Sequence, residues 1–262
     1  MVEKNIENNN SLNSLEKVFF KNSKEQKLCG LISYPNSNSK SIVILVHGYS
    51  TSKDGISISR LRSLLSNNNI NTFSIDLDGC GESEGDFENQ TLSSALDDIE
   101  HAYSYIKSRG FTEVSLFGSS MAGPPVMTFA LNHPEIKKLG LKAPVSDIIT
   151  QRKNEYGLDY IENAKKDGFF EFTNSKSRTF KINFYFYEDA KNYVMKEKVK
   201  NIKVPTLILH GTNDKSVDLS FSKELIKDFP EATLIIIEGA DHKLIVDGSD
   251  LKSNLEFVEW FK

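Results

Sequence analysis

The chain has 262 residues, which is enough for one α/β domain with an insertion. Its formal net charge is −4 and no basic stripe runs along it, so we expect no nucleic-acid partner. Residues 1–14 are rich in Asn and lack an apolar segment, which predicts a disordered tail and no secretory signal. No apolar run is long enough to cross a membrane. Cys29 and Cys80 lack metal-ligand spacing, as expected of reduced thiols in a cytoplasmic protein.

Strands dominate the first fifty residues and then alternate with helices. Residues 15–20 and 28–34 predict an antiparallel hairpin around a polar turn. Beyond them, apolar runs separated by helical patterns indicate parallel β–α–β units. The runs are 42–46, 72–76, 114–118, 139–143, 206–210 and 233–237. Together they predict an α/β fold with a mostly parallel central sheet of about eight strands.

Two helices are clear from their periodicity. Residues 91–109 carry apolar side chains at spacings of three and four and end before Gly110. The final helix, 249–262, is expected to turn Leu251, Leu255 and Val258 toward the core.

Residues 146–200 break the alternation of strands and helices. A stretch of this length inside a compact α/β domain is typical of a lid or cap, so 15–145 and 201–262 are expected to form the core. Its many Phe and Tyr side chains suit a surface that buries apolar substrate groups. Four of them are the substrate-binding candidates: Tyr156, Tyr160, Phe184 and Phe186.

Ser120 lies in a turn between an apolar strand and a helix. An abrupt strand-to-helix turn strains the central residue and crowds the positions two before and two after it, here Gly118 and Ala122. Gly123 is expected to let the helix lie close to the strand. The strain exposes the Ser120 hydroxyl beside the first amides of the helix, which suits a nucleophile.

Two further candidates follow apolar strands in the order Ser, Asp, His. Asp214 comes after 206–210 and His242 after 233–237, and parallel sheets place such residues at one edge. Asp218 and Asp241 are rivals for the acid. Asp241 adjoins the histidine in the chain, and Asp218 is expected at a helix start, so Asp214 is preferred.

These motifs resemble those of α/β-hydrolase fold esterases over residues 15–262. Among these esterases, the chain is most similar to bacterial feruloyl/cinnamoyl-type carboxylesterases. The residues that carry this resemblance are His47-Gly48, the loop 76–85, the Ser120 turn, 210–214 and 239–242. Relatives often carry His before the nucleophile and Gly two after it, where this chain has Ser119 and Ala122. The resemblance implies that the insertion covers the active site.

The expected activity is serine-dependent hydrolysis of small aromatic or short-to-medium acyl esters through an acyl-enzyme. Ser120, Asp214 and His242 are the catalytic candidates, and the backbone N–H groups of Tyr49 and Met121 are the candidate oxyanion donors. No metal or organic cofactor is implied. The expected partner is a small-molecule ester, with no membrane involved and a homodimer left open. A thioesterase, a peptidase and a non-catalytic binding protein remain alternatives.

Overall fold

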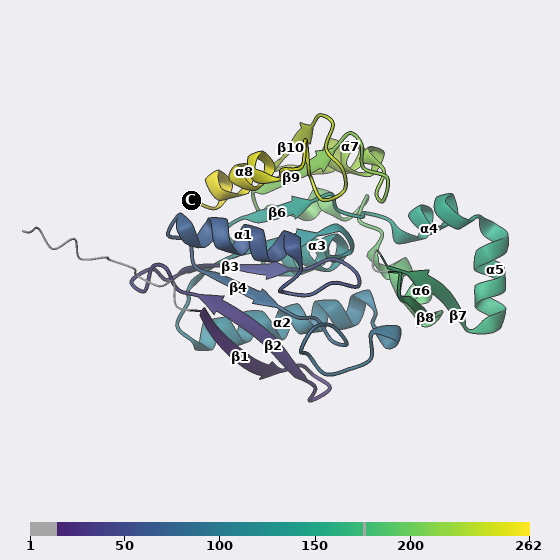
Figure 1. Ribbon diagram of the computed structural model, residues 1–262, viewed down its shortest axis with the longest axis horizontal. Helices are drawn as coiled ribbons and strands as arrows, with labels where there is room; N and C mark the ends of the chain where they lie inside the picture. The colour runs from purple at the N-terminus through teal and green to yellow at the C-terminus, as the bar shows by residue number, and fades with distance from the viewer. Residues whose placement is uncertain (1–14, 175–176) are drawn as a thin grey trace, which may run out of the picture.

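An eight-stranded sheet forms the centre of the molecule (Figure 1). The computed structural model describes residues 15–174 and 177–262, so the predicted tail, 1–14, lies outside the described residues. The strand order is β1-β2-β4-β3-β5-β6-β9-β10. Only the pairs β1·β2 and β2·β4 are antiparallel, and the other neighbours run parallel. The predicted class and the mostly parallel sheet are confirmed.

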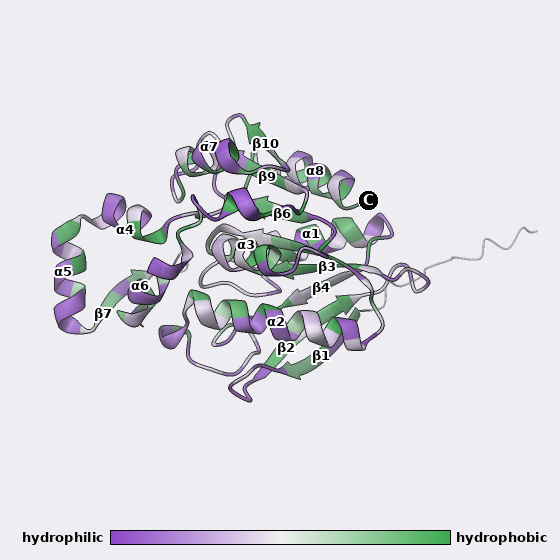
Figure 2. Ribbon diagram, turned by 180° about the vertical axis from the view of Figure 1, so that it is seen from behind, coloured by the Kyte–Doolittle hydropathy of each residue, from purple (hydrophilic) through white to green (hydrophobic). Residues whose placement is uncertain are grey.

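The strands agree with the predicted apolar runs to within a residue or two. Residues of the central strands are almost wholly buried, because helices cover both faces of the sheet, and Figure 2 shows these strands as largely hydrophobic. The strands are β1 Leu15–Lys21, β2 Lys27–Ser33, β3 Ser41–Val46, β4 Thr72–Ile75, β5 Glu113–Ser119, β6 Leu139–Lys142, β9 Thr206–Gly211 and β10 Ala232–Ile237.

Helices pack on the two faces as separate apolar layers. Helices α2 (Leu92–Ser108) and α3 (Gly123–Asn132) share one buried cluster, and α1 (Ile56–Asn67) and α8 (Leu251–Phe261) share the other. The predicted helix 91–109 is α2. Its start is fixed by a capping box in which Thr91 and Ser94 each bind the other's backbone N–H at 3.0 Å.

The inward face predicted for the last helix is wrong in part. Val258 is buried, but Leu251 and Leu255 are 51% and 42% exposed. The buried face instead carries Phe257, whose ring meets that of Phe117 edge-on at 4.9 Å. Packing against an aromatic ring of the sheet therefore sets the rotation of α8, which leucine spacing alone did not reveal.

Residues 146–200 form a group of short elements beyond the end of the large sheet (Figure 1). A two-stranded antiparallel sheet, β7·β8, lies among them and does not join the eight-stranded sheet. We call residues 146–200 the insertion. Its regular elements are α4 Ile148–Tyr156, α5 Leu158–Asp167, β7 Phe169–Thr173, β8 Thr179–Asn183 and α6 Tyr185–Ala190. In the described part of the chain no helix is long and apolar enough to span a membrane.

A buried carboxyl ties the first hairpin to α2. Asp98 is fully buried and accepts hydrogen bonds from the Asn22 side chain (2.9 Å) and from the backbone N–H of Asp78 (2.7 Å). Burial, and then the charge of Asp78, raise the pKa of Asp98 to about 8. Near neutral pH this carboxyl therefore retains its proton in the folded protein.

Replacing Asp98 with Asn should flatten the pH dependence of stability. An unfolded Asp loses its proton near pH 4, whereas folded Asp98 holds it to about pH 8. The contribution of Asp98 to the free energy of unfolding is therefore complete below pH 4 and is lost as pH rises toward 8. Urea midpoints at pH 5 and pH 8.5 measure this loss. The exposed Asp86 supplies the control, Asp86→Asn. An Asp98→Asn midpoint that falls as steeply as wild type would contradict the assignment.

Candidate active site

The backbone at Ser120 is strained, as the sequence pattern predicted, and the strain takes the form of a left-handed conformation. Its φ is 56°, which is uncommon for a residue with a side chain, and it opens a short 3-10 helix, Ser120–Ala122. A Cβ on Gly118 would lie 2.6 Å from the Val126 side chain, so only glycine fits. Gly123 is constrained by a neighbour other than the one expected, because its Cβ would lie 2.8 Å from Pro144 after β6.

His242 connects Ser120 to Asp214 by two hydrogen bonds. The Nδ1 of His242 is 2.7 Å from Asp214 Oδ2, and Nε2 is 3.0 Å from Ser120 Oγ. An ionised carboxylate only accepts, so Nδ1 carries the proton and Nε2 is free to accept one from the hydroxyl. The structure thus brings together three residues from the loops after β5, β9 and β10.

Asp214 is held as a buried, ionised acceptor. Its Oδ1 accepts the backbone N–H groups of Ser216 (2.8 Å) and Val217 (2.9 Å). Burial alone would raise the pKa of Asp214, but hydrogen bonds from His210 and His242 outweigh it and lower that pKa. His210, whose Nε2 is 3.3 Å from Oδ2, is a partner that sequence reasoning missed.

The rival carboxylates are occupied elsewhere. Asp218 caps helix α7 (Leu219–Asp228) and accepts the N–H of Ser220 at 2.7 Å, as its predicted place at a helix start suggests. Asp241 accepts two backbone N–H groups of its own turn, from Lys243 and Ile245. Neither carboxylate has a hydrogen bond to His242 among the described residues.

Two backbone amides lie beside Ser120 with their N–H groups available. Met121 is the second residue of its 3-10 helix, where amides lack a partner within the helix, and Tyr49 follows β3. The loops are close, because a Cβ on Gly48 would lie 3.3 Å from the Ser120 Cβ. The His47 ring fixes the Tyr49 loop. Its Nδ1–H donates to Gly48 O at 2.7 Å, and its Nε2 accepts from Leu77 N–H at 3.1 Å.

A buried ion pair also holds the loop that contains Tyr49 and Lys53. Lys53 is 1% exposed, and its Nζ lies 2.8 Å from Asp76 Oδ2 and 2.9 Å from Glu82 Oε1. The Lys53 backbone N–H also donates to Asp76 Oδ1 at 2.7 Å. Sequence reasoning did not single out either residue of this pair. The only signal is an acid placed directly after the buried strand β4.

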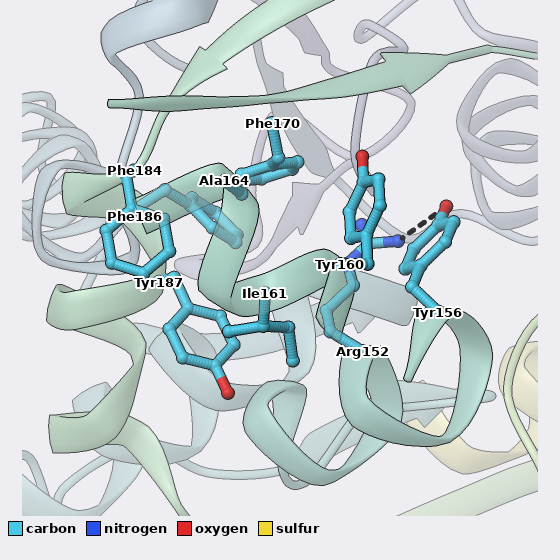
Figure 3. A pocket seen from close by; sticks show the side chains of 9 residues that line it. All are labelled: Arg152, Tyr156, Tyr160, Ile161, Ala164, Phe170, Phe184, Phe186 and Tyr187. Carbon is cyan, nitrogen blue, oxygen red and sulfur yellow. Dashed lines mark hydrogen bonds between the residues drawn. The ribbon is translucent and has the colours of Figure 1, made fainter. Parts of the chain in front are cut away.

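The four predicted substrate-binding candidates line one pocket in the insertion (Figure 3). Tyr156 and Tyr160 stack at 4.7 Å between ring centroids, and the Tyr160 hydroxyl donates to a backbone carbonyl of β7. Phe184 and Phe186 are buried on the opposite side. Phe186 also borders a second cavity, lined by Tyr49 and Met121, so it lies between the insertion and the catalytic loops. In the described ranges no three His, Cys, Asp or Glu side chains group as a metal ion would need.

Comparison with known proteins points to one family. A family model described as serine aminopeptidase, S33, matches residues 37–159 and 185–249. Human protein ABHD12B is 30% identical over 190 residues, which are 70% of this chain and 48% of that protein. The chain thus spans about half the length of this relative. The AB hydrolase superfamily protein YisY of Bacillus subtilis is 25% identical over 64% of this chain and 73% of its own length.

Solved structures share the whole architecture at low identity. Est1E from Butyrivibrio proteoclasticus, in a structure with ferulic acid bound, superimposes with a TM-score of 0.80 at 23% identity, covering 93% of this chain and 97% of its own. The α/β hydrolase domain-containing protein 10 from mouse gives a TM-score of 0.79 at 18% identity, covering 94% and 98%. Likeness at this level shows the fold that the sequence predicted.

Removing the cation of the buried pair should destabilise the protein. Lys53→Met leaves the Asp76 carboxylate buried without a counter-charge, which costs about 3–5 kcal/mol in comparable cases. Chemical denaturation measures the change, and adding Asp76→Asn should restore part of it. Lys21→Met, at an exposed ion pair, is the control and should change stability little. A small effect of Lys53→Met would mean that solvent reaches Asp76.

Proposed function

Because this chain belongs to the serine aminopeptidase S33 family and has the α/β-hydrolase fold, we propose that it is a serine-dependent hydrolase of carboxylic esters. The observation that carries the proposal is the hydrogen-bonded series Ser120–His242–Asp214, with distances of 3.0 and 2.7 Å. That series supplies a nucleophile, a general base and a group that orients the base, which are the parts of acyl transfer.

Acylation follows from the placement of these groups. Ser120 Oγ attacks the ester carbonyl carbon while His242 Nε2 takes the hydroxyl proton. The carbonyl oxygen becomes an oxyanion and accepts hydrogen bonds from the backbone N–H groups of Tyr49 and Met121. The bond to the alcohol oxygen then breaks, and His242 returns its proton to that oxygen. Asp214 stabilises the cationic imidazole throughout, because its lowered pKa keeps it ionised.

Deacylation reverses the roles with water as nucleophile. His242 takes a proton from the water, whose oxygen attacks the acyl carbon. The bond to Ser120 Oγ breaks and the serine recovers its proton, which releases the acid. No step draws on a cofactor.

The insertion is proposed to act as a cap that selects the ester. Its aromatic pocket supports esters with small aromatic or short-to-medium acyl groups, with Tyr156, Tyr160, Phe184 and Phe186 as contact residues. The pocket adjoins the Tyr49 loop through Phe186, which rests 5.5 Å from the Tyr49 ring.

A peptidase is the second candidate, and the family description favours it. The same triad can cleave an amide, and an aminopeptidase must also bind a protonated amino terminus, for which carboxylates are the usual partners. The pocket beside the site carries a buried arginine instead, which supports esters over amino-terminal peptides. A comparison of 4-nitrophenyl esters, acyl thioesters and aminoacyl 4-nitroanilides separates these activities.

A fluorophosphonate probe should label the protein at Ser120. The hydroxyl that His242 activates attacks phosphorus as it attacks an ester carbonyl. Gel fluorescence and peptide mass measurement locate the adduct, and Ser120→Ala should fold but take no label. Ser119→Ala, one residue earlier, is the matched control and should still be labelled. Label retained by Ser120→Ala, or absent from wild type, would contradict the proposed nucleophile and favour a non-catalytic protein.

Asp214→Asn should lower kcat by about 10³- to 10⁴-fold, because the amide cannot hold His242 in the required tautomer. Asp218→Asn and Asp241→Asn remove carboxylates that lie in the same two loops but bind backbone N–H groups instead of His242. They should lower kcat far less. Initial rates on one 4-nitrophenyl ester measure all three variants. A severe loss in Asp218→Asn alone would move the acid assignment to that residue.

A further inference from the structure

Arg152 is a nearly buried cation in the wall of the insertion's pocket. It lies on α4, is 8% exposed, and faces the rings of Tyr156 and Phe170, whose centroids lie 5.6 and 6.0 Å from its Cζ. Figure 3 shows it beside Tyr156 and Tyr160 on one side of the pocket, with Phe184 and Phe186 on the other. A guanidinium in such a wall is a recognition element when part of it lacks a partner.

In the part of the chain that the structure describes, one edge of this guanidinium has no hydrogen-bond acceptor. Nη1 donates to Glu155 Oε2 at 2.9 Å and to the Tyr156 hydroxyl at 3.4 Å. Nε is buried without a partner, and Nη2 has no acceptor among the described residues. The Nε–H and one Nη2–H point the same way in the planar group, which is the fork that binds a carboxylate through two parallel bonds.

The neighbouring carboxylates do not fill that edge. Glu155 is bound to the other nitrogen and its side chain is 45% exposed. Asp147 caps α4 and accepts both the N–H and the hydroxyl of Thr150. A buried N–H without an acceptor costs stability, so an acceptor supplied by a ligand would be strongly favoured there.

A second unpartnered group joins this pocket to the catalytic loops. The Tyr49 hydroxyl is buried and has no hydrogen-bond partner within residues 15–174 and 177–262. The Tyr49 ring lies 4.9 Å from the ring of Phe172, and the Phe172 ring centroid lies 5.8 Å from Arg152 Cζ. The Tyr49 backbone amide is the proposed oxyanion donor. Arg152 and the Tyr49 side chain therefore pack against the same ring, that of Phe172.

The sheet order indicates which half of an ester reaches this space. His242 follows β10, whereas Tyr49 follows β3, and these strands lie on opposite sides of β5, from which Ser120 projects. His242 protonates the departing alcohol, so the alcohol lies toward β10. The carbonyl oxygen points to the Tyr49 and Met121 amides, so the acyl chain takes the remaining direction, away from β10 and toward Phe172 and Phe186 of the insertion, which pack on the Tyr49 ring.

We propose that Arg152 binds a carboxylate at the far end of the acyl chain, so that the substrates are half-esters of dicarboxylic acids with an apolar spacer. The proposal rests on the proposed ester hydrolysis and adds the substrate class. The aromatic walls bury the spacer, the free guanidinium edge binds the carboxylate through two bonds, and the Tyr49 hydroxyl donates to the same group.

Two matched esters test this directly. The 4-nitrophenyl half-ester of adipic acid carries the distal carboxylate, and the 4-nitrophenyl ester of adipamic acid replaces it with a neutral amide of the same shape. Wild type should show a kcat/KM about 10-fold or more higher on the charged ester, expressed mainly in KM, because a charge-assisted bidentate pair is much stronger than a neutral contact. In Arg152→Gln the ratio of the two kcat/KM values should fall to about one.

Arg178→Gln is the control, since Arg178 is an exposed arginine stacked on Phe180 of the same insertion and should leave the ratio unchanged. Equal rates of wild type on the two esters would overturn the proposal, even if Arg152→Gln did not fold. So would a ratio that survives in Arg152→Gln, or a loss equal on both esters. Failure of the ester function itself looks different, since neither ester is cleaved and the fluorophosphonate does not label Ser120.

Discussion

The left-handed backbone at Ser120 is the constraint on which the rest of the site depends. A non-glycine residue at φ 56° is strained by about 1–3 kcal/mol, so its surroundings must hold it there. Close neighbours do so, since side chains at Gly48, Gly118 or Gly123 would each collide with or press on atoms around the turn. This conformation directs the Ser120 Oγ toward the edge of the sheet where the loops of Asp214 and His242 lie. Backbone packing, rather than side-chain attraction, sets the position of the Ser120 hydroxyl.

Hydrogen bonds and an ion pair then fix the loops that the strands bring close to Ser120. The Asp214 carboxylate accepts hydrogen bonds from two backbone N–H groups of its own loop as well as from His242. It is therefore oriented independently of the histidine. The Tyr49 loop is fixed in the same way, by the His47 ring and by the Lys53–Asp76 pair. Each half of the site is thus organised before a substrate arrives, which lowers the reorganisation needed in the transition state.

Sequence reasoning reached the residues whose position follows from one local rule. Ser120, Asp214 and His242 each lie shortly after the carboxyl end of an apolar strand, and parallel strands deliver such residues to the same edge. Features that depend on distant partners were beyond it. The Lys53–Asp76 pair, the contact of His210 with Asp214, and the rotation of α8 set by Phe117 are not encoded in spacing. The aromatic candidates share one pocket, but the free edge of Arg152 required side-chain geometry.

Tyr49 joins the loop beside Ser120 to the insertion. Its backbone amide belongs to that loop, while its ring packs against Phe172 and Phe186 of the insertion. The first role depends only on the backbone that His47 holds, and the second only on the side chain. Substitutions in the aromatic wall can therefore change the shape of the pocket without moving the amide. Helix α4 is also attached to the Asp214 loop, because the Gln151 side chain donates to the Ser216 carbonyl, so one hydrogen bond links the wall of the pocket to that loop.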